Sequence, residues 1–278
     1  MSNPLEQVDQ HLRSLRAAGV EHITPRPLAA APHPAPTSAT PTSATPASAT
    51  PQPTPTPAVT PLAIQASLFA AAPETVEVPA DQGERRTALT LLAEKVAGCT
   101  RCPQLASTRT QTVFGVGPMD AELCFVGEAP GADEDRTGEP FVGAAGQLLN
   151  RIIAACGMKR EEVYICNILR CRPPGNRQPN PDEAANCREY LEETLRLVQP
   201  KIVCALGGSA TKYLLGVDTG ITKLRGRWLE YRGIPVMATF HPSYLLRNPE
   251  AKREVWADMK LVLARMGRPI PGAGAPGG

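Results

Sequence analysis

The chain has 278 residues, 30 of them proline, and its 29 Lys and Arg against 27 Asp and Glu give a formal net charge of +2. No apolar run reaches the roughly 18 residues that a membrane-spanning helix needs. The polar first 19 residues lack the apolar core of a secretion signal. We therefore expect a cytoplasmic, reducing compartment, in which eight cysteines favour metal binding or burial over disulfides.

Two segments precede the part of the chain that we expect to fold. Residues 1–23 predict a short amphipathic helix, because apolar side chains recur on one stripe of residues 5–18. Residues 24–83 are rich in Pro, Ala, Thr and Ser, with no Lys, Arg, Asp or Glu from 27 to 73. Such a tract cannot bury enough apolar surface to offset its ordering entropy, so we expect a disordered linker.

Residues 84–268 have the pattern of one folded domain, and residues 269–278 form a flexible Gly/Pro tail. Four short apolar runs predict strands, at Glu122–Val126, Val163–Ile168, Ile202–Leu206 and Val236–Phe240. Helical patterns lie before, between and after them, at 85–97, Gly146–Cys156, Pro181–Leu197, Ser209–Leu215 and Ala251–Met266. Strands that alternate with helices predict a three-layer α/β/α sandwich around a short four-stranded parallel sheet.

Each predicted strand is followed by a polar group or a glycine turn. The four ends are Gly127-Glu128, Asn167, Gly207-Gly208-Ser209 and His241-Pro242-Ser243. Because open parallel sheets bind ligands at the carboxyl ends of their strands, four such ends predict one site. Residues 201–268 hold twelve Lys and Arg against five Asp and Glu, which suggests a polyanionic partner or a solvated charged face.

Four of the eight cysteines lie outside the predicted strands and could bind a metal. Cys99 and Cys102 form a C-x2-C pair, Cys171 lies in a Pro/Arg loop, and fifteen residues separate Cys171 from Cys187. The remaining four are most simply buried hydrophobes, at Cys124, Cys156, Cys166 and Cys204. Four thiolates suit an iron–sulfur cluster or a structural zinc, and their spacing does not decide between the two. Eight reduced cysteines without metal are the remaining alternative.

Three segments carry a family resemblance: GEAPGADEDRTGEPFVGAAGQLLNRII, NILRCRPPGNRQPNPDEAANC and HPSYLLRN. In order and spacing they resemble the motifs of family 4 uracil-DNA glycosylases, the iron–sulfur branch of that superfamily, over about Ala97 to Met266. The resemblance implies a base-excision repair enzyme, which we expect to be a monomer. It would flip uracil out of single- or double-stranded DNA, hydrolyse its N-glycosidic bond and leave an abasic site. It also implies a structural 4Fe–4S cluster on Cys99, Cys102, Cys171 and Cys187, with zinc as the alternative.

The resemblance assigns the uracil-binding residues. Phe141 matches the family's stacking aromatic, and Gly127 and His241 belong to the same uracil-binding set. The amide of Asn167 can donate to uracil O4 and accept from N3, a polarity that cytosine reverses. A core Phe and an Asn that caps a strand end are the structural alternatives.

The resemblance also implies the catalytic residues. His241 matches a histidine that hydrogen-bonds uracil O2 and stabilises the leaving uracil anion. Glu128 matches the acidic residue that positions or activates water. Ala129 stands where some other branches of the superfamily have Asp, which leaves Glu134 as the alternative base.

The expected DNA contacts follow the third and fourth strands. Ser209 and Ser243 are candidate phosphate contacts, because backbone N–H groups at helix N-termini bind phosphate; Ser209 as a plain helix cap is the alternative. Tyr244, Leu245, Leu246 and Arg247 resemble the loop that wedges into the duplex where the base leaves. A buried leucine pair is the alternative for this loop.

One further segment lies inside the linker. Gln65 to Phe69, with the sequence QASLF, is similar to the peptide by which bacterial repair and replication proteins dock on the sliding clamp. The similarity predicts recruitment to the clamp, in the bacterial cytoplasm or nucleoid. Two other functions stay open: a glycosylase for other deaminated bases, and a non-catalytic uracil-DNA or replication-associated binding protein.

Overall fold

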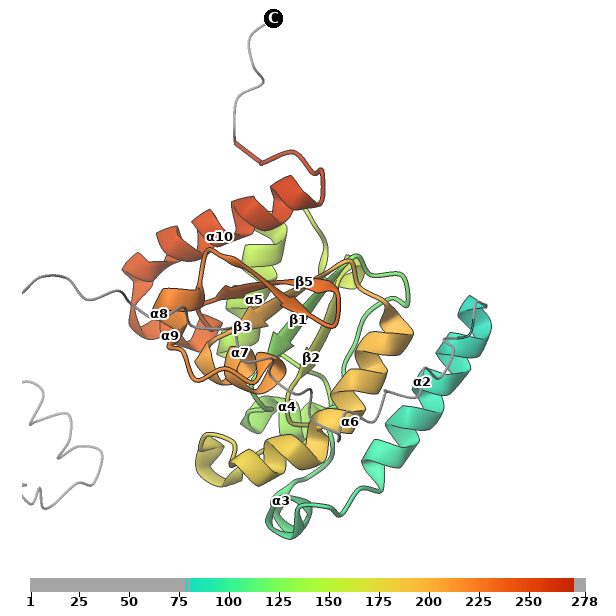
Figure 1. The fold of residues 1–278 in the computed structure, drawn as a ribbon. Helices are drawn as coiled ribbons and strands as arrows, with labels where there is room; N and C mark the ends of the chain where they lie inside the picture. Colours follow the sequence, from blue (N-terminus) through green and yellow to red (C-terminus); the bar gives the residue numbers. More distant parts are fainter. Residues whose placement is uncertain (1–78, 80, 273–278) are drawn as a thin grey trace, which may run out of the picture. The chain divides into compact units, whose positions relative to one another are not determined.

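The computed structural model describes residue 79 and residues 81–272 (Figure 1). The predicted helix at residues 5–18, nearly all of the linker with its segment 65–69, and the last residues of the tail lie outside this range. Among the described residues, no helix is both long enough and apolar enough to cross a membrane.

A five-stranded sheet in the order β2-β1-β3-β5-β4 forms the centre of the fold. Four strands run parallel to one another: β1 (Leu123–Gly127), β2 (Tyr164–Asn167), β3 (Ile202–Leu206) and β5 (Ile234–Thr239). They correspond to the four predicted strands, and the predicted α/β class is confirmed.

The fifth strand corrects the expected count of four. β4 (Trp228–Tyr231) pairs antiparallel with β5 through the two-residue turn Arg232-Gly233. Both turn residues have positive φ, 49° and 81°, as the tight turn of a twisted hairpin requires. Because β4 is a short edge strand with one exposed and three half-buried side chains, it lacks the continuous apolar run that marked the other four.

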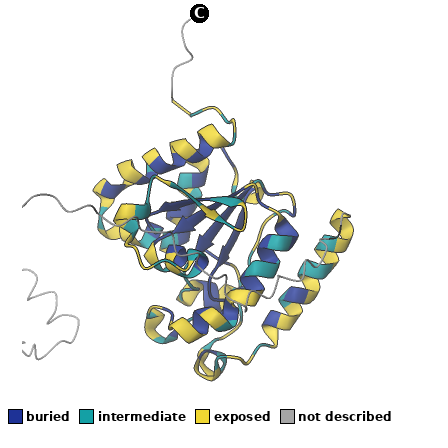
Figure 2. Ribbon diagram, viewed as in Figure 1, coloured by how far each residue is buried: buried dark blue, intermediate teal, exposed yellow. Residues whose placement is uncertain are grey.

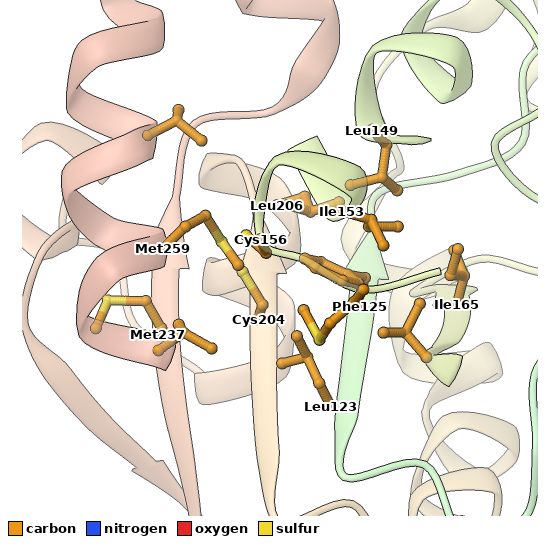
Figure 3. Packing of buried hydrophobic residues seen from close by; sticks show 14 of the residues in the cluster. Leu123, Phe125, Leu149, Ile153, Cys156, Ile165, Cys204, Leu206, Met237 and Met259 are labelled. Atoms are coloured by element: carbon orange, nitrogen blue, oxygen red, sulfur yellow. The ribbon is translucent and has the colours of Figure 1, made fainter. Parts of the chain in front are cut away.

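Helices cover both faces of the sheet, and its strands β1, β2 and β3 are fully buried (Figure 2). α5 (Ala144–Ala155) and α10 (Lys252–Arg265) pack on the face that carries Leu123 and Phe125 (Figure 3). α3 (Pro103–Thr108), α6 (Pro181–Val198) and α7 (Gly208–Leu215) pack on the other face. α2 (Gln82–Ala97) lies against α6 in a separate apolar cluster. The result is a three-layer sandwich.

Several short elements follow the carboxyl ends of the strands. They are α4 (Ala132–Thr137) after β1, η2 (Pro174–Asn176) after β2, α8 (Ile221–Leu224) after α7, and α9 (Pro242–Arg247) and η3 (Pro249–Ala251) after β5. η1 (Arg160–Glu162) precedes β2. From β1 the chain passes to β2 on one side and then crosses to β3 on the other. Such a switch point is where open α/β sheets bind ligands.

Candidate active site

A cavity of about 590 Å³ lies at the carboxyl ends of the parallel strands. Its wall brings together most of the residues that the sequence singled out: Glu128, Glu134, Phe141, Asn167, Ser209, His241, Ser243, Tyr244 and Arg247. These residues are up to 119 positions apart in the chain, from Glu128 to Arg247. The parallel strands are what bring them to one place.

Asn167, the last residue of β2, presents an amide oxygen that has no partner among the described residues. The residue is 1% exposed, and its Oδ1 atom is buried without a hydrogen bond to any described residue. Gly127 pairs with it across the sheet. A Cβ atom on Gly127 would lie 2.3 Å from Asn167 Oδ1 and 2.5 Å from Phe141 Cζ. The missing side chain of Gly127 therefore makes room for both, and an unpaired buried amide favours a ligand that pairs with it.

Phe141 reaches the cavity from a strained loop conformation. Its φ is 55°, a value that bulky residues rarely adopt, and its side chain is buried. The ring centroid lies 5.6 Å from that of His241, and the two rings are tilted by 37°. The aromatic face and the imidazole thus belong to the same wall.

Glu134 serves the same loop through its carboxylate. Oε1 accepts from the backbone N–H groups of Val142 and Gly143, at 2.9 and 3.0 Å. Oε2 accepts from the N–H of Gly131 at 3.0 Å. Because both oxygens are engaged by backbone donors, this carboxylate is bound into the loop although it lines the cavity.

Glu128 is placed differently. It follows β1 directly, is half-buried and lines the cavity. Within the described part of the chain, no hydrogen bond or ion pair engages its carboxylate. Of the two carboxylates considered from the sequence, Glu128 is thus the one that has its acceptor atoms free for a water molecule.

His241 caps α9 through its own ring. Its Nδ1 accepts the backbone N–H of Ser243 at 3.1 Å and lies 2.7 Å from Ser243 Oγ. Since a backbone N–H only donates, Nδ1 carries no proton, and the neutral ring carries its proton on Nε2. Burial, with the charge of Arg247 in second place, lowers the pKa of His241 to about 4, although Glu134 acts in the opposite sense. The imidazole is therefore a neutral donor near pH 7.

The expected DNA contacts fall into two groups. Tyr244 and Leu246 are 38% and 45% exposed, and Ser209 lies on the cavity at the start of α7. Leu245, in contrast, is fully buried in the core, so its prediction as a DNA contact is wrong: α9 turns that side chain inward. The hydroxyl and the backbone N–H of Ser243 both contact Nδ1 of His241, so Ser243 orients the imidazole ring.

Two parts of the wall were missed from the sequence. The loop after β2 contributes Asn176, Arg177 and Gln178, and α8 contributes Ile221 and Thr222. The polar, basic run RPPGNRQ was a usable signal for the loop. The four-residue helix α8 has no such signal, because it is too short to show a period.

The four predicted ligand cysteines lie near one another: Cys187 is on α6, and Cys171 is close enough to the other three for their charges to interact. Cys171 and Cys187 are buried, and Cys99 and Cys102 are half-buried. Burial raises the pKa of the Cys187 thiol to about 11, and nearby Cys171 and Cys102 add to the rise. For Cys171 the pKa is also raised by burial, with contributions from Cys99 and Cys102.

N–H donors point at two of these sulfurs. Arg109 Nη1 lies 3.0 Å from Cys171 Sγ, and Asn186 Nδ2 lies 3.5 Å from Cys102 Sγ. Such donors stabilise thiolates, so the set fits a thiolate-bound group. Across the described residues, no three or more His, Cys, Asp or Glu side chains are arranged as a ready site for a metal ion. The other four cysteines are buried, as predicted.

Comparison with known proteins places these features in a family. Residues 114–260 match the model of the uracil DNA glycosylase superfamily. The chain is 44% identical over 180 residues to the type-4 uracil-DNA glycosylase of Thermotoga maritima. The aligned segment covers 63% of this chain and 93% of that protein. The chain is also 39% identical over 188 residues to the type-4 uracil-DNA glycosylase of Archaeoglobus fulgidus. That alignment covers 65% of this chain and 94% of the Archaeoglobus protein. A type-5 uracil-DNA glycosylase of Thermus thermophilus is 29% identical over 153 residues.

Gly127→Ala should fill the space that Asn167 and Phe141 share. The new methyl group would overlap both side chains on a buried central strand, so we expect a loss of about 1–3 kcal/mol in the free energy of unfolding. Urea denaturation measures this. Gly220→Ala is the control, because its Cβ would meet no atom within 4 Å. Equal stability of the two variants would contradict the packing described.

Proposed function

Because the chain belongs to the uracil-DNA glycosylase superfamily and, within it, to the type-4 uracil-DNA glycosylases, we propose how its own residues excise the base. The protein is a DNA glycosylase that hydrolyses the N-glycosidic bond of uracil in DNA, and it serves DNA repair. Uracil-containing DNA is its substrate.

The observation that carries the proposal is the unpaired Asn167 amide in one cavity with the Nε2–H donor of His241. A uracil flipped out of the stack presents a flat face, an N3–H donor and two carbonyl acceptors. Asn167 accepts from N3–H and donates to O4, which cytosine cannot match. Phe141 stacks on the ring. The bare Cα of Gly127 lets these two side chains approach each other.

Bond cleavage places negative charge on the departing uracil, and His241 meets it at O2. A neutral imidazole whose proton is fixed on Nε2 donates a hydrogen bond without first losing water or changing protonation. Ser243 holds the ring in this tautomer. Glu128, whose carboxylate binds no other described residue, orients the attacking water. Its negative charge also stabilises the positive charge that develops on the sugar as the glycosidic bond breaks.

DNA is held around the cavity by groups that do not touch uracil. The N-terminal turn of α7 with Ser209 offers backbone N–H groups to a phosphate. Arg247 adds positive charge at the rim. The exposed side chains of Tyr244 and Leu246 fill the gap that the flipped nucleotide leaves, as apolar wedges do elsewhere.

One assay tests the reaction and the role of His241 together. Oligonucleotides with a single uracil, single- or double-stranded, should break at that position after enzyme and alkali. His241→Ala should lower the rate about 10²–10³-fold, the usual effect of losing one charge-stabilising donor, while DNA binding persists. His33→Ala in the proline-rich tract is the matched control. No cleavage above a blank without enzyme would reject the activity.

The same assay gives a pH dependence. The active form of His241 is the neutral ring, which predominates above its pKa of about 4. The contribution of His241 to kcat/KM should therefore be constant from pH 8 to 5 and fall only as pH approaches 4. A loss of activity centred near pH 6.5, absent from His241→Ala, would contradict the lowered pKa.

We propose that Cys99, Cys102, Cys171 and Cys187 hold a 4Fe–4S cluster, with structural zinc as the alternative. When bound, the cluster would tie together the segments that carry the cysteines, among them α6 with Cys187. Arg109 and Asn186 support the sulfurs by N–H donation. Purified protein should be brown and contain iron. Cys187→Ala should lose the iron, whereas Cys156→Ala, buried but outside the set, should keep it. Colourless protein that contains zinc alone would refute the cluster.

For residues 65–69 we propose docking on the replication sliding clamp, through Leu68 and Phe69 in an apolar pocket of the clamp and Gln65 as a polar anchor. A monomeric enzyme in the bacterial cytoplasm would thereby reach newly made DNA. A peptide of residues 60–72 should bind the clamp, and Phe69→Ala should weaken the binding of the full chain. The proposal would be rejected if the peptide did not bind the clamp and Phe69→Ala left the binding of the full chain unchanged.

A further inference from the structure

Phe141 holds a backbone conformation that its own chemistry disfavours. A φ of 55° costs a bulky L-residue free energy, and such strain persists only where the surroundings fix it. The residues that fix it are therefore part of the base-binding site even when they do not touch the base. This matters because the ring of Phe141 forms a wall of the cavity.

Arg160, in η1, is the cation that fixes the chain at Phe141. Its Nη1 donates to the carbonyl oxygen of Phe141 at 3.3 Å and to Asn150 Oδ1 at 2.9 Å. Its Nη2 donates to the carbonyl oxygen of Pro140 at 2.5 Å and to Glu139 Oε1 at 3.1 Å. One guanidinium thus binds two successive carbonyl groups, a geometry that suits its planar, forked donors.

Glu134 completes the arrangement from the other side of Phe141. Its Oε1 takes the N–H groups of Val142 and Gly143, the two residues that follow the ring. The guanidinium of Arg160 therefore holds the backbone carbonyl groups of Pro140 and Phe141. The carboxylate of Glu134 holds the backbone N–H groups of the two residues that follow. Gly146 adds a steric limit, since a Cβ there would lie 1.9 Å from the Phe141 carbonyl oxygen.

Arg160 does not belong to the reacting groups or to the expected DNA surface. Its side chain is 17% exposed, and it is absent from the residues that line the cavity. An arginine that serves DNA binding would present its donors to solvent, whereas these donors face the loop. The remaining role is to act through Phe141.

We propose that Arg160 is a positioning residue that holds Phe141 in its strained conformation and so sets the affinity for the uracil ring. The inference rests on the proposed stacking role of Phe141. When Arg160 is replaced, the backbone of Phe141 relaxes toward an ordinary φ value and its ring moves. Bound uracil then loses the stacking contact with that ring. His241 and Glu128, held by other elements, keep the bond-breaking step.

The test uses the full-length enzyme with Arg160→Gln, Arg160→Lys and the control Arg151→Gln. Arg151 is exposed on α5, and no hydrogen bond or ion pair joins it to the rest of the described chain. Kinetics on a single-uracil oligonucleotide give KM and kcat, and added free uracil gives an inhibition constant. Arg160→Gln should raise KM and the inhibition constant about tenfold, the scale of strain at one positive-φ residue, with little change in kcat. Arg160→Lys should restore part of the affinity.

A double-mutant cycle with Phe141→Leu separates positioning from general stability. Once the aromatic ring is gone, Arg160→Gln should no longer change the inhibition constant of uracil. An equal effect in both backgrounds, or a lower melting temperature with an unchanged inhibition constant, would overturn the proposal. If Phe141→Leu alone leaves the inhibition constant at its wild-type value, the stacking role itself fails. That result differs from the failure of Arg160 alone.

Discussion

The register of the parallel strands is the constraint on which the cavity depends. Gly127 pairs with Asn167, and Leu206 pairs with Thr239, so that four strands end at one edge within a residue or two of each other. A slip of one residue in any pair would turn its side chains to the opposite face. Asn167 would then lose its place beside Gly127, and no change in the loops could restore it. The apolar layers that fix the register therefore also fix the site.

Two carboxylates near the cavity bind groups of the protein itself rather than a ligand. Glu134 binds three N–H groups. Asp258, 1% exposed, accepts from Thr239 Oγ1 at 2.6 Å and from Arg225, and so anchors the strand end two residues before His241. Because these carboxylates are engaged, the free carboxylate of Glu128 stands out chemically. The inference that Glu128 binds water therefore depends on Glu134 and Asp258 being engaged by other groups of the protein.

The sequence predicted the strands and their polar ends because each strand is a buried apolar run, and parallel topology then brings the ends together. β4 escaped because an edge strand carries no such run. Leu245 was misplaced because a helix of only six residues has no period that shows which side faces inward. The choice between Glu128 and Glu134 stayed open because the partners of Glu134 include residues eight and nine positions along the chain, in a loop whose path the sequence does not specify.

The cysteines and the cavity share one loop, which couples the two. The chain between Cys171 and Cys187 supplies Asn176, Arg177 and Gln178 to the cavity wall. Arg177 binds Glu183 at 2.6 and 2.9 Å, and it binds Gln104, two residues after Cys102, at 3.0 Å. A group that ties the four sulfurs together therefore also limits where Arg177 can lie. A group bound there would support catalysis by holding the wall of the cavity, at a distance from the bond that breaks.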